Sequence, residues 1–487
     1  MDSPPHEPKS PSPSDPLPFE AIGRLPLPGM AVPAEVAFSP NGAVVSYLHA
    51  PDGSLDRRLF VRDLGSLAGE PREVTLTGGA RSEDDLNLAE HLRRERARET
   101  GLGIQKAVWA RDADVLLVPL VDGIQVLRGL STGGPVAENV VASAAGDVED
   151  PQLSPDGTRV AYVREGDLYL SPTGAGAGRD REVRLTTTAR EGLSNGLAEY
   201  VAQEEMARAH GFWWSRDGSL IAYAEVDEAD VPVYRIVHQG DDGPGGPGFE
   251  DHRYPFAGGP NAKVRLGVVG ASGGETTWMD TGGEDHYLAR VQFTGDRRLL
   301  AEIESRDQHR LDLVCFDTTT GARTLLHREE HEVWVNLHDD CRPLGAGVAG
   351  GGAFAFVWSS ERSGFRHLEL RDGDGSLLRV LTEGTFAVDR VETVDESAGL
   401  VYYTAASPSP TERHLYAVAL SGGAPRRITS EAGIHDVVVS ERGGLFADRH
   451  SCLTEPPSVS IRSLGDGSVL CRLHARRDPR IDELGLE

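Results

Sequence analysis

The chain has 487 residues, and its 49 Lys and Arg against 76 Asp and Glu give a formal net charge of −27. Such an acidic chain repels phosphate backbones and anionic lipid headgroups, so nucleic acid and a membrane are excluded as expected partners. The 57 Gly and 30 Pro indicate many turns, and the apolar runs between them have strand length, so we expect an all-β fold.

The N-terminal residues 1–20 contain seven prolines and no apolar core of a signal peptide. We interpret them as a disordered Pro-rich tail. The four cysteines are too far apart in the sequence for a Cys-x-x-Cys motif, and four in so long a chain do not form a disulfide framework: Cys315, Cys341, Cys452 and Cys471. We therefore expect a reducing, cytoplasmic compartment.

A short pattern recurs along the rest of the chain. An apolar residue and a Ser or Thr precede a turn with Asp or Asn and Gly, then come two strand-like runs and an ending such as Leu-Thr. Gly accepts a positive φ and Asp caps its own backbone, so the motif is typical of tight turns between strands. In chain order the copies begin at Phe38, Trp109, Leu153, Trp214 and Phe293, followed by units over about 333–382, 388–429 and 435–473.

One such sheet cannot bury both of its faces, but about eight of them bury one another when they are arranged radially. The repeats therefore predict an eight-bladed β-propeller over residues 30–475, with a short helical insertion between blades. The alternative is a pair of β-sandwiches, and the regular repetition of the unit favours the propeller.

Three segments break the repeat. Residues 83–98 are strongly charged, Asn195–His210 reads as a helix capped by Asn195 and stopped by Gly211, and Gln239–Pro260 reads as a long surface loop. The first segment ends in a basic cluster of Arg93, Arg94, Arg96 and Arg98. Arg98 is a candidate for holding a substrate carbonyl. The alternative is ion pairing with neighbouring acids such as Glu95 and Glu99.

The helical insertion carries the most specific pattern of the chain. Residues 198–208 read AEYVAQEEMAR, and residues 211–218 follow with GFWWSRDG. Here the sequence resembles the dipeptidyl peptidase IV family, whose N-terminal domain is an eight-bladed propeller with a double glutamate on a short helix between two blades. The resemblance continues at Val231-Pro232, over Tyr254–Asn261 and over Gly364–His367, and it covers about residues 30–475.

The resemblance implies that Glu204 and Glu205 bind the free N-terminal ammonium of a peptide substrate. The chemistry is reasonable in itself, since an ammonium has three donors that two carboxylates satisfy by charge-assisted hydrogen bonds. Adjacent helix residues point about 100° apart, so they can hold one small cation from two sides. Without the resemblance, a pair of glutamates on a helix is ordinarily a solvated face.

A serine nucleophile is not expected in this chain. The Gly-x-Ser-x-Gly pattern occurs at Gly129–Gly133, Gly192–Gly196 and Gly270–Gly274, but none has the strand before and the helix after that a nucleophile elbow needs. In the family a hydrolase half follows the propeller, and residues 476–487 resemble the linker into that half. We therefore expect no catalytic triad here and no peptidase activity of this chain alone, although the family is one of serine-type dipeptidyl peptidases.

No cofactor is expected, because no phosphate-binding loop occurs in the sequence. No metal is expected either. The polar residues His331 and His338–Cys341 match no ligand spacing, and we interpret the segment as a turn before a strand.

The resemblance implies a substrate-recognition and gating propeller of a serine exopeptidase, which fixes the peptide N-terminus so that a hydrolase domain releases a dipeptide. The expected partners are a peptide with a free N-terminus, a separate α/β-hydrolase domain and a second copy of the chain. The alternative is a stand-alone propeller that serves as a protein-interaction scaffold, because fold does not dictate function.

Overall fold

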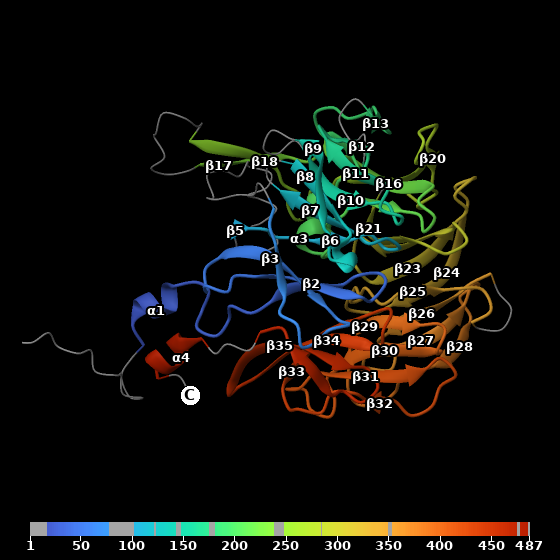
Figure 1. Cartoon of the computed structure of the whole chain (residues 1–487). Helices are drawn as coiled ribbons and strands as arrows, with labels where there is room; N and C mark the ends of the chain where they lie inside the picture. Colours follow the sequence, from blue (N-terminus) through green and yellow to red (C-terminus); the bar gives the residue numbers. More distant parts are fainter. Residues whose placement is uncertain are drawn as a thin grey trace, which may run out of the picture.

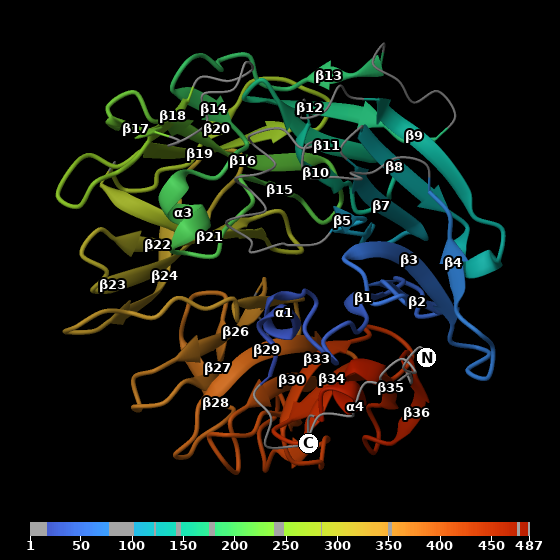
Figure 2. The same ribbon diagram turned by 90° about the vertical axis from the view of Figure 1, so that its left-hand side faces the viewer.

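The structure is a computed structural model, and it describes residues 17–76, 102–120, 123–142, 148–174, 181–237, 248–283, 285–348, 353–474 and 478–485. Within these residues, eight antiparallel sheets stand around a common axis (Figure 2). Each sheet is built from a contiguous stretch of chain, with its strands in sequence order from the axis outward. The fold is therefore the predicted eight-bladed β-propeller, and the two-sandwich alternative is wrong.

The first four blades have these strands. Blade I holds β1 (Ala34–Phe38), β2 (Val44–His49), β3 (Asp56–Asp63) and β4 (Arg72–Val74), with β5 (Leu102–Gly103) parallel to β3. Blade II holds β6 (Val108–Trp109), β7 (Val115–Leu120), β8 (Gly123–Arg128) and β9 (Val136–Ala142). Blade III holds β10 (Glu149–Leu153), β11 (Arg159–Arg164), β12 (Asp167–Pro172) and β13 (Val183–Arg184). Blade IV holds β14 (Leu193–Asn195), β15 (Phe212–Trp214), β16 (Leu220–Asp227), β19 (Lys263–Gly270) and β20 (Thr277–Trp278).

The last four blades are regular. Blade V holds β21 (His286–Phe293), β22 (Leu299–Ser305), β23 (Arg310–Phe316) and β24 (Arg323–Glu330). Blade VI holds β25 (Arg342–Leu344), β26 (Ala355–Ser360), β27 (His367–Asp372) and β28 (Leu377–Val380). Blade VII holds β29 (Val388–Asp395), β30 (Leu400–Ala405), β31 (His414–Ala419) and β32 (Arg426–Arg427). Blade VIII holds β33 (Ile434–Val439), β34 (Leu445–Cys452), β35 (Glu455–Ser463) and β36 (Val469–Arg472).

The remaining described elements lie outside the blades. They are the hairpin of β17 (Val233–Val237) and β18 (Phe249–Arg253), the helices α1 (Phe19–Gly23), α3 (Tyr200–Glu204) and α4 (Pro479–Glu483), and the 3-10 turn η2 (Leu130–Thr132). Figure 1 shows the β17–β18 hairpin, α1 and α4 projecting from one side of the ring, the side that Figure 2 presents to the viewer with α3 in front of the strands. No described helix is long and apolar enough to cross a membrane.

The recurrent Ser-x-Asp-Gly motif closes the first turn of a blade. In blade III, Ser154 Oγ donates to Asp156 Oδ1 at 2.6 Å and accepts from the Arg159 backbone N–H at 3.0 Å. The Asp156 carboxylate also accepts from the Thr158 N–H, while Gly157 adopts a φ of +66° that disfavours a side chain. Equivalent bonds form at Ser39 and Ser215, so two short side chains add hydrogen bonds to the backbone bond that closes each turn.

The recurrent Leu-Thr ending joins the third strand of a blade to the segment after the fourth. Thr382 Oγ1 accepts from the Leu368 N–H at 2.9 Å and lies 3.1 Å from His367 Nδ1. Thr429 makes the same contacts with Leu415 and His414. The Thr hydroxyl thus replaces a backbone acceptor where the outermost strand has ended.

The core is divided among the gaps between blades. Each of eight clusters of buried apolar side chains in the described residues joins one blade to the next. The last gap is closed by Val45 and Tyr47 of blade I against Ala447 and Ile461 of blade VIII. No strand of the described residues is shared between these two blades, so side-chain packing closes the ring.

The two ends of the described chain meet beside this closing gap. The Gly29 N–H donates to Asp478 Oδ2 at 2.9 Å, and Arg480 Nη1 donates to the Pro26 carbonyl at 2.9 Å. Ile481 of α4 is buried. α1 begins at Phe19, within the last two residues of the predicted tail, while residues 1–16 of that tail lie outside the described residues.

The predicted loop over Gln239–Pro260 is partly wrong, because β18 lies within it and pairs with β17 as an antiparallel ribbon. Alternation of Gly and Pro with charged residues concealed a strand that pairs only locally. The charged segment 83–98, with Arg98 and its neighbouring arginines, lies outside the described residues.

Candidate functional site at helix α3

The inner strand of blade IV is split into two pieces. β14 pairs with one half of β16 and β15 with the other, and the chain between them forms the insertion that carries α3. Leu197 and His210 form an antiparallel bridge at its base. A Cβ at Gly211 would lie 2.3 Å from the carbonyl carbon of Leu197, so Gly211 is required by the close approach of the two chain segments.

The helix is much shorter than predicted. α3 covers Tyr200–Glu204 only, with Glu199 as its N-terminal flank and Glu205 as its C-cap. Asn195 is no cap, since it lies in β14 with its side chain buried. Positive φ angles of +85° at Gly196 and +51° at Ala207 stop the helix on both sides. The sequence prediction failed because the insertion must return to its starting point within one inner strand.

One side of α3 packs on blade V. Ala198, Ala202 and Met206 are buried against Ala289 of β21. The spacing of four between the first three residues is the apolar stripe of a helical turn. Glu204 and Glu205 are both exposed. The sequence thus orients the insertion so that its small apolar residues meet the blade while its double glutamate faces solvent.

Buried polar contacts fix the same segment. Arg208 donates through Nη2 to Glu199 Oε2 at 2.6 Å, through Nε to the Leu288 carbonyl at 2.9 Å and through Nη1 to the His210 carbonyl at 2.8 Å. The Arg208 and Glu199 side chains are 4% and 5% exposed. In addition, Arg290 Nη1 donates to the Met206 carbonyl at 2.8 Å.

Motifs that are distant in the sequence meet around α3. The Tyr200 ring lies edge-on to Tyr254, with 5.1 Å between the ring centroids. Tyr254 in turn contacts Phe256, which contacts Tyr234 of the β17–β18 hairpin. Asn261 Nδ2 donates to the Tyr287 hydroxyl at 3.1 Å. The segment 254–261, noted for its resemblance, therefore supports the helix that carries the double glutamate.

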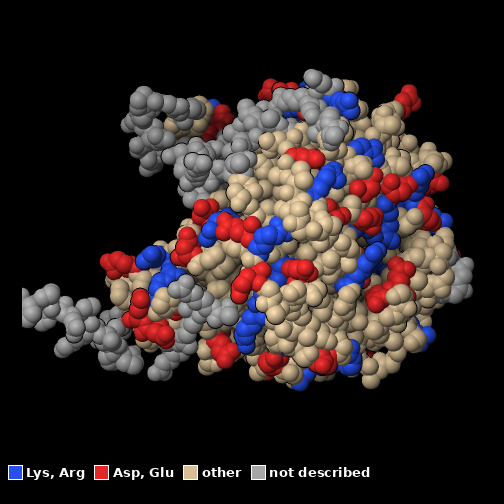
Figure 3. Space-filling model, viewed as in Figure 1, with Lys and Arg blue, Asp and Glu red and all other residues tan. Residues whose placement is uncertain are grey.

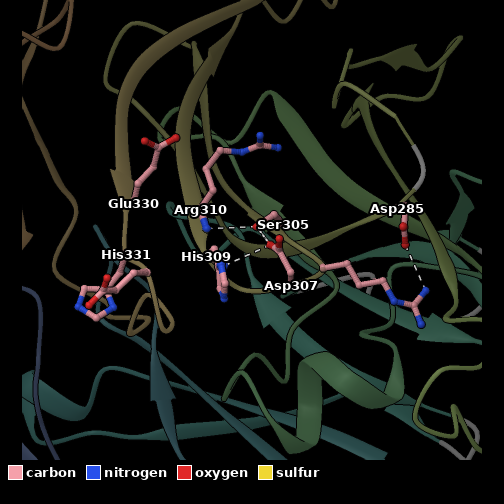
Figure 4. Close-up of a pocket in the computed structure, with 9 residues that line it drawn as sticks. Asp285, Ser305, Asp307, His309, Arg310, Glu330 and His331 are labelled. Atoms are coloured by element: carbon pink, nitrogen blue, oxygen red, sulfur yellow. Dashed lines mark hydrogen bonds and ion pairs between the residues drawn. The ribbon is translucent and has the colours of Figure 1, made fainter.

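An open hollow of about 820 Å³ lies at the end of blade V (Figure 4). Its lining includes Asp285, directly before β21, and Asp307, Arg310 and Glu330. Arg306 pairs with Asp285 at 3.1 Å, while Asp307 accepts from Ser305 Oγ at 2.6 Å. α3 packs on Tyr287 and Ala289 of β21, the strand that follows Asp285 of this lining.

The three Gly-x-Ser-x-Gly serines lie in different settings. Ser131 is in η2 and donates to Asp114. Ser194 lies within β14, and Ser272 follows the end of β19. None of the three lies between a strand and an immediately following helix, which is the setting of a nucleophile elbow.

Among the described residues, no group of three or more His, Cys, Asp or Glu side chains is arranged to hold a metal ion. His338–Cys341 lie before β25, as the sequence predicts for a turn leading into a strand. All four cysteines are free. Basic and acidic side chains are interspersed on the side of the molecule seen in Figure 3.

The fold and the insertion define the class: an eight-bladed propeller whose split inner strand presents two adjacent carboxylates. Residues 130–457 match the family described as the dipeptidyl peptidase IV (DPP IV) N-terminal region, and the chain belongs to this family.

Similar proteins carry related names. A "Probable dipeptidyl-aminopeptidase B" of Emericella nidulans is 29% identical over 351 residues, which are 67% of this chain and 38% of that protein. A "Probable dipeptidyl peptidase 4" of Aspergillus flavus is 27% identical over 57% of this chain and 36% of its own length. The chain thus spans well under half the length of these relatives.

The crystal structure of Porphyromonas gingivalis dipeptidyl peptidase 4 superposes with a TM-score of 0.74. The match covers 98% of this chain and 64% of that one at 21% sequence identity, a likeness of fold.

Sequence reasoning singled out Glu204 and Glu205 but missed the residues that hold them. Glu199 and Arg208 read as ordinary surface charges of a helix. Their burial depends on the Leu288 carbonyl, which lies eighty residues further along the chain. The only local signal is the apolar stripe from Ala198 to Met206.

Proposed function

We propose that this chain is the substrate-recognition and gating propeller of a dipeptidyl peptidase IV-like serine exopeptidase. Glu204 and Glu205 bind the free N-terminal ammonium of a peptide, and a hydrolase domain then releases a dipeptide. The observation that carries the proposal is the exposed carboxylate pair on a segment whose other side is buried. The names of the relatives, dipeptidyl-aminopeptidase B and dipeptidyl peptidase 4, support the same activity.

In this mechanism the propeller contributes positioning. Two carboxylates accept charge-assisted hydrogen bonds from the ammonium and set its distance from the scissile bond. An internal peptide segment has no ammonium and leaves the carboxylates to repel each other. The preference for chain ends therefore comes from charge. The attack on the carbonyl belongs to a serine nucleophile with its base.

The test is a comparison of two probes, Gly-Pro-Ala-Ala amide with a free N-terminus and its N-acetylated form, by saturation-transfer NMR with the full chain. We expect binding of the free amine to be tighter by roughly tenfold or more, since each charge-assisted bond contributes about 1.5–3 kcal/mol. The preference should fade above about pH 8, where the α-amine loses its proton. Equal binding of both probes would overturn the proposal.

A second measurement addresses catalysis. Incubation of the chain with a Gly-Pro chromogenic amide should give no turnover. Turnover that a serine-directed inhibitor abolishes would contradict the assignment of a purely recognising role.

The scaffold alternative draws on one observation. The β17–β18 hairpin exposes Val233, Tyr234, Ile236 and Val237, a set of apolar side chains typical of contact surfaces. A variant with E204Q and E205Q separates the two functions. It should lose the amine preference while any association of the chain, measured by analytical ultracentrifugation, is unchanged.

A further inference from the structure

The Arg208–Glu199 pair is an ion pair almost completely removed from solvent. Its side chains are 4% and 5% exposed, and its shortest bond is 2.6 Å. Burying two charges costs several kcal/mol per ion, and a buried pair adds little net stability compared with apolar residues of similar size. Stabilisation of the ring is therefore a weak explanation for its presence.

The contacts of Arg208 have a geometric consequence. Glu199 flanks the start of α3, and Arg208 follows its end, so their bond closes the segment that contains Glu204 and Glu205 into a loop. The bonds from Arg208 to the Leu288 and His210 carbonyls then fasten this loop to β21 and to the base of the insertion. The guanidinium makes these bonds from three separate nitrogens, Nε, Nη1 and Nη2, whereas the ammonium of a lysine has a single nitrogen that cannot occupy all three positions.

Local helical structure does little to fix the segment that carries the double glutamate. α3 has a single turn, its first residue lacks a side-chain cap, and Glu205 is already the C-cap. An isolated helix of this length is unstable in water. The position of both carboxylates therefore depends on tertiary contacts, which include the packing of α3 on blade V and the bonds that hold the two ends of the segment.

We propose that Arg208 and Glu199 are positioning residues, which set the spacing and direction of Glu204 and Glu205 and thereby the selectivity for a peptide ammonium. The proposal rests on the function proposed above. Neither residue touches the ligand, since both are buried beneath the helix. Both act through the backbone of the loop that they close.

The test uses the full chain with E199M and R208M together, which removes both charges and leaves neither unpaired. The matched control is E369M with R371M, because that pair in β27 has the same 2.6 Å bond and side chains that are 6% and 5% exposed. Arg371 also donates through Nε to Glu369 Oε2 at 2.9 Å and through Nη1 to the Gly375 carbonyl at 2.8 Å. Both double variants are assayed with the free and the N-acetylated Gly-Pro-Ala-Ala amide, and their folding is followed by thermal unfolding.

We expect the tenfold preference for the free amine to fall to about one in E199M/R208M and to persist in E369M/R371M. If folded E199M/R208M keeps the preference for the free amine, or if E369M/R371M loses it equally, the positioning role is overturned. The proposal that Glu204 and Glu205 bind the amine then still stands. Absence of a preference in the unsubstituted chain overturns both proposals. If E199M/R208M does not fold, R208K takes its place, because it keeps the charge but has one nitrogen in place of the three from which Arg208 donates. The same outcomes then decide between the proposals.

Discussion

At the scale of single residues, hydroxyl groups of Ser and Thr replace backbone partners at the ends of strands. Thr429 is buried, and its Oγ1 accepts from the Leu415 N–H at 3.1 Å while it contacts His414 Nδ1 at 3.1 Å. A buried donor that loses its acceptor costs about 1–3 kcal/mol. The Leu-Thr endings of the repeats therefore have a hydrogen-bonding reason.

Replacement of Thr429 by Val keeps the shape and removes the acceptor. We expect the free energy of unfolding to fall by about 1–3 kcal/mol, measured by urea denaturation. Thr411→Val, at an exposed turn position, is the control and should change it by less than about 0.5 kcal/mol. An equal effect of both substitutions would contradict the role of the buried hydroxyl.

Glu302 is the clearest titrating residue of the core. Its side chain in β22 is buried, and its Oε2 has no hydrogen-bond partner. Burial raises the pKa of Glu302 to about 8 against the opposing charge of Arg290, and Asp339 and Asp340 raise it further. The folded chain therefore favours the protonated acid. This stabilisation is complete below the ordinary pKa of 4.5 and is lost as the pH rises through about 8.

Glu302→Gln removes this pH dependence, because the amide is neutral at every pH. We expect nearly equal stability of variant and parent at pH 4 and an advantage of the variant that grows to several kcal/mol by pH 9, as each unit of pKa shift corresponds to about 1.4 kcal/mol. Thermal unfolding at several pH values between 4 and 9 measures this difference in stability between variant and parent. Glu330→Gln, at a 65% exposed side chain, should show no such trend, and parallel curves for Glu302→Gln and parent would contradict the assignment.

At the scale of elements, α3 belongs to an insertion in blade IV but packs on blade V. The side chain of α3 that faces this blade is small: Ala202 is fully buried and lies against Ala289 of β21. A larger side chain there must push the helix outward, since packed interiors leave no room for extra methylenes. The ring depends little on α3, because the α3 contact shares only the partly buried Leu337 with the inter-blade clusters of the described residues, and no buried residue of the α3 contact belongs to one of them.

Ala202→Leu should therefore loosen α3 without unfolding the propeller. We expect faster amide hydrogen exchange over residues 198–210 and loss of the amine preference, with a reduction of global stability of about 1–3 kcal/mol at most. Ala209→Leu, at an exposed position of the same insertion, is the matched control. Unchanged exchange in Ala202→Leu would show that the contact with blade V does not hold the helix.

At the scale of the whole molecule, no strand among the described ranges is shared between the first and the last blade. The described N-terminal segment and α4 meet at Asp478, which accepts from the Gly29 N–H and from the Arg480 N–H at the start of α4. The hydrogen bond from the Arg480 side chain, whose Nη2 donates to Asp478 Oδ2 at 2.7 Å, lowers the pKa of Asp478 to about 2. Its contribution is present above the ordinary pKa of 3.8 and is lost as the pH falls toward 2.

Asp478→Ala removes the cap of α4 and the acceptor for Gly29 together. We expect α4 to detach, at a cost of about 1–2 kcal/mol, and limited proteolysis to cut the segments 24–33 and 478–485 faster. The blades should stay resistant. Glu483→Ala on the same helix is the control. Equal digestion of the two variants would contradict the role of Asp478 in joining α4 to the N-terminal segment.

The sequence by itself determined the repeat and therefore the fold. Ser-x-Asp-Gly turns and Leu-Thr endings are satisfied by hydrogen bonds within one blade, so each copy could be recognised from local chemistry. The count of eight came from the number of copies, and their arrangement in a ring followed because a half-exposed sheet must find a neighbour on each side. The double glutamate was also visible locally, as a motif beside an aromatic pair.

Only the tertiary structure decided how that motif is held. The sequence predicted a helix from Asn195 to His210, but both ends belong to the inner strand of blade IV, and one turn remains. Glu199 and Arg208 became a buried pair because a carbonyl from another blade completes their hydrogen bonds. Contacts between residues so far apart leave no periodic trace in the sequence, since they depend on where the closed ring places the next blade.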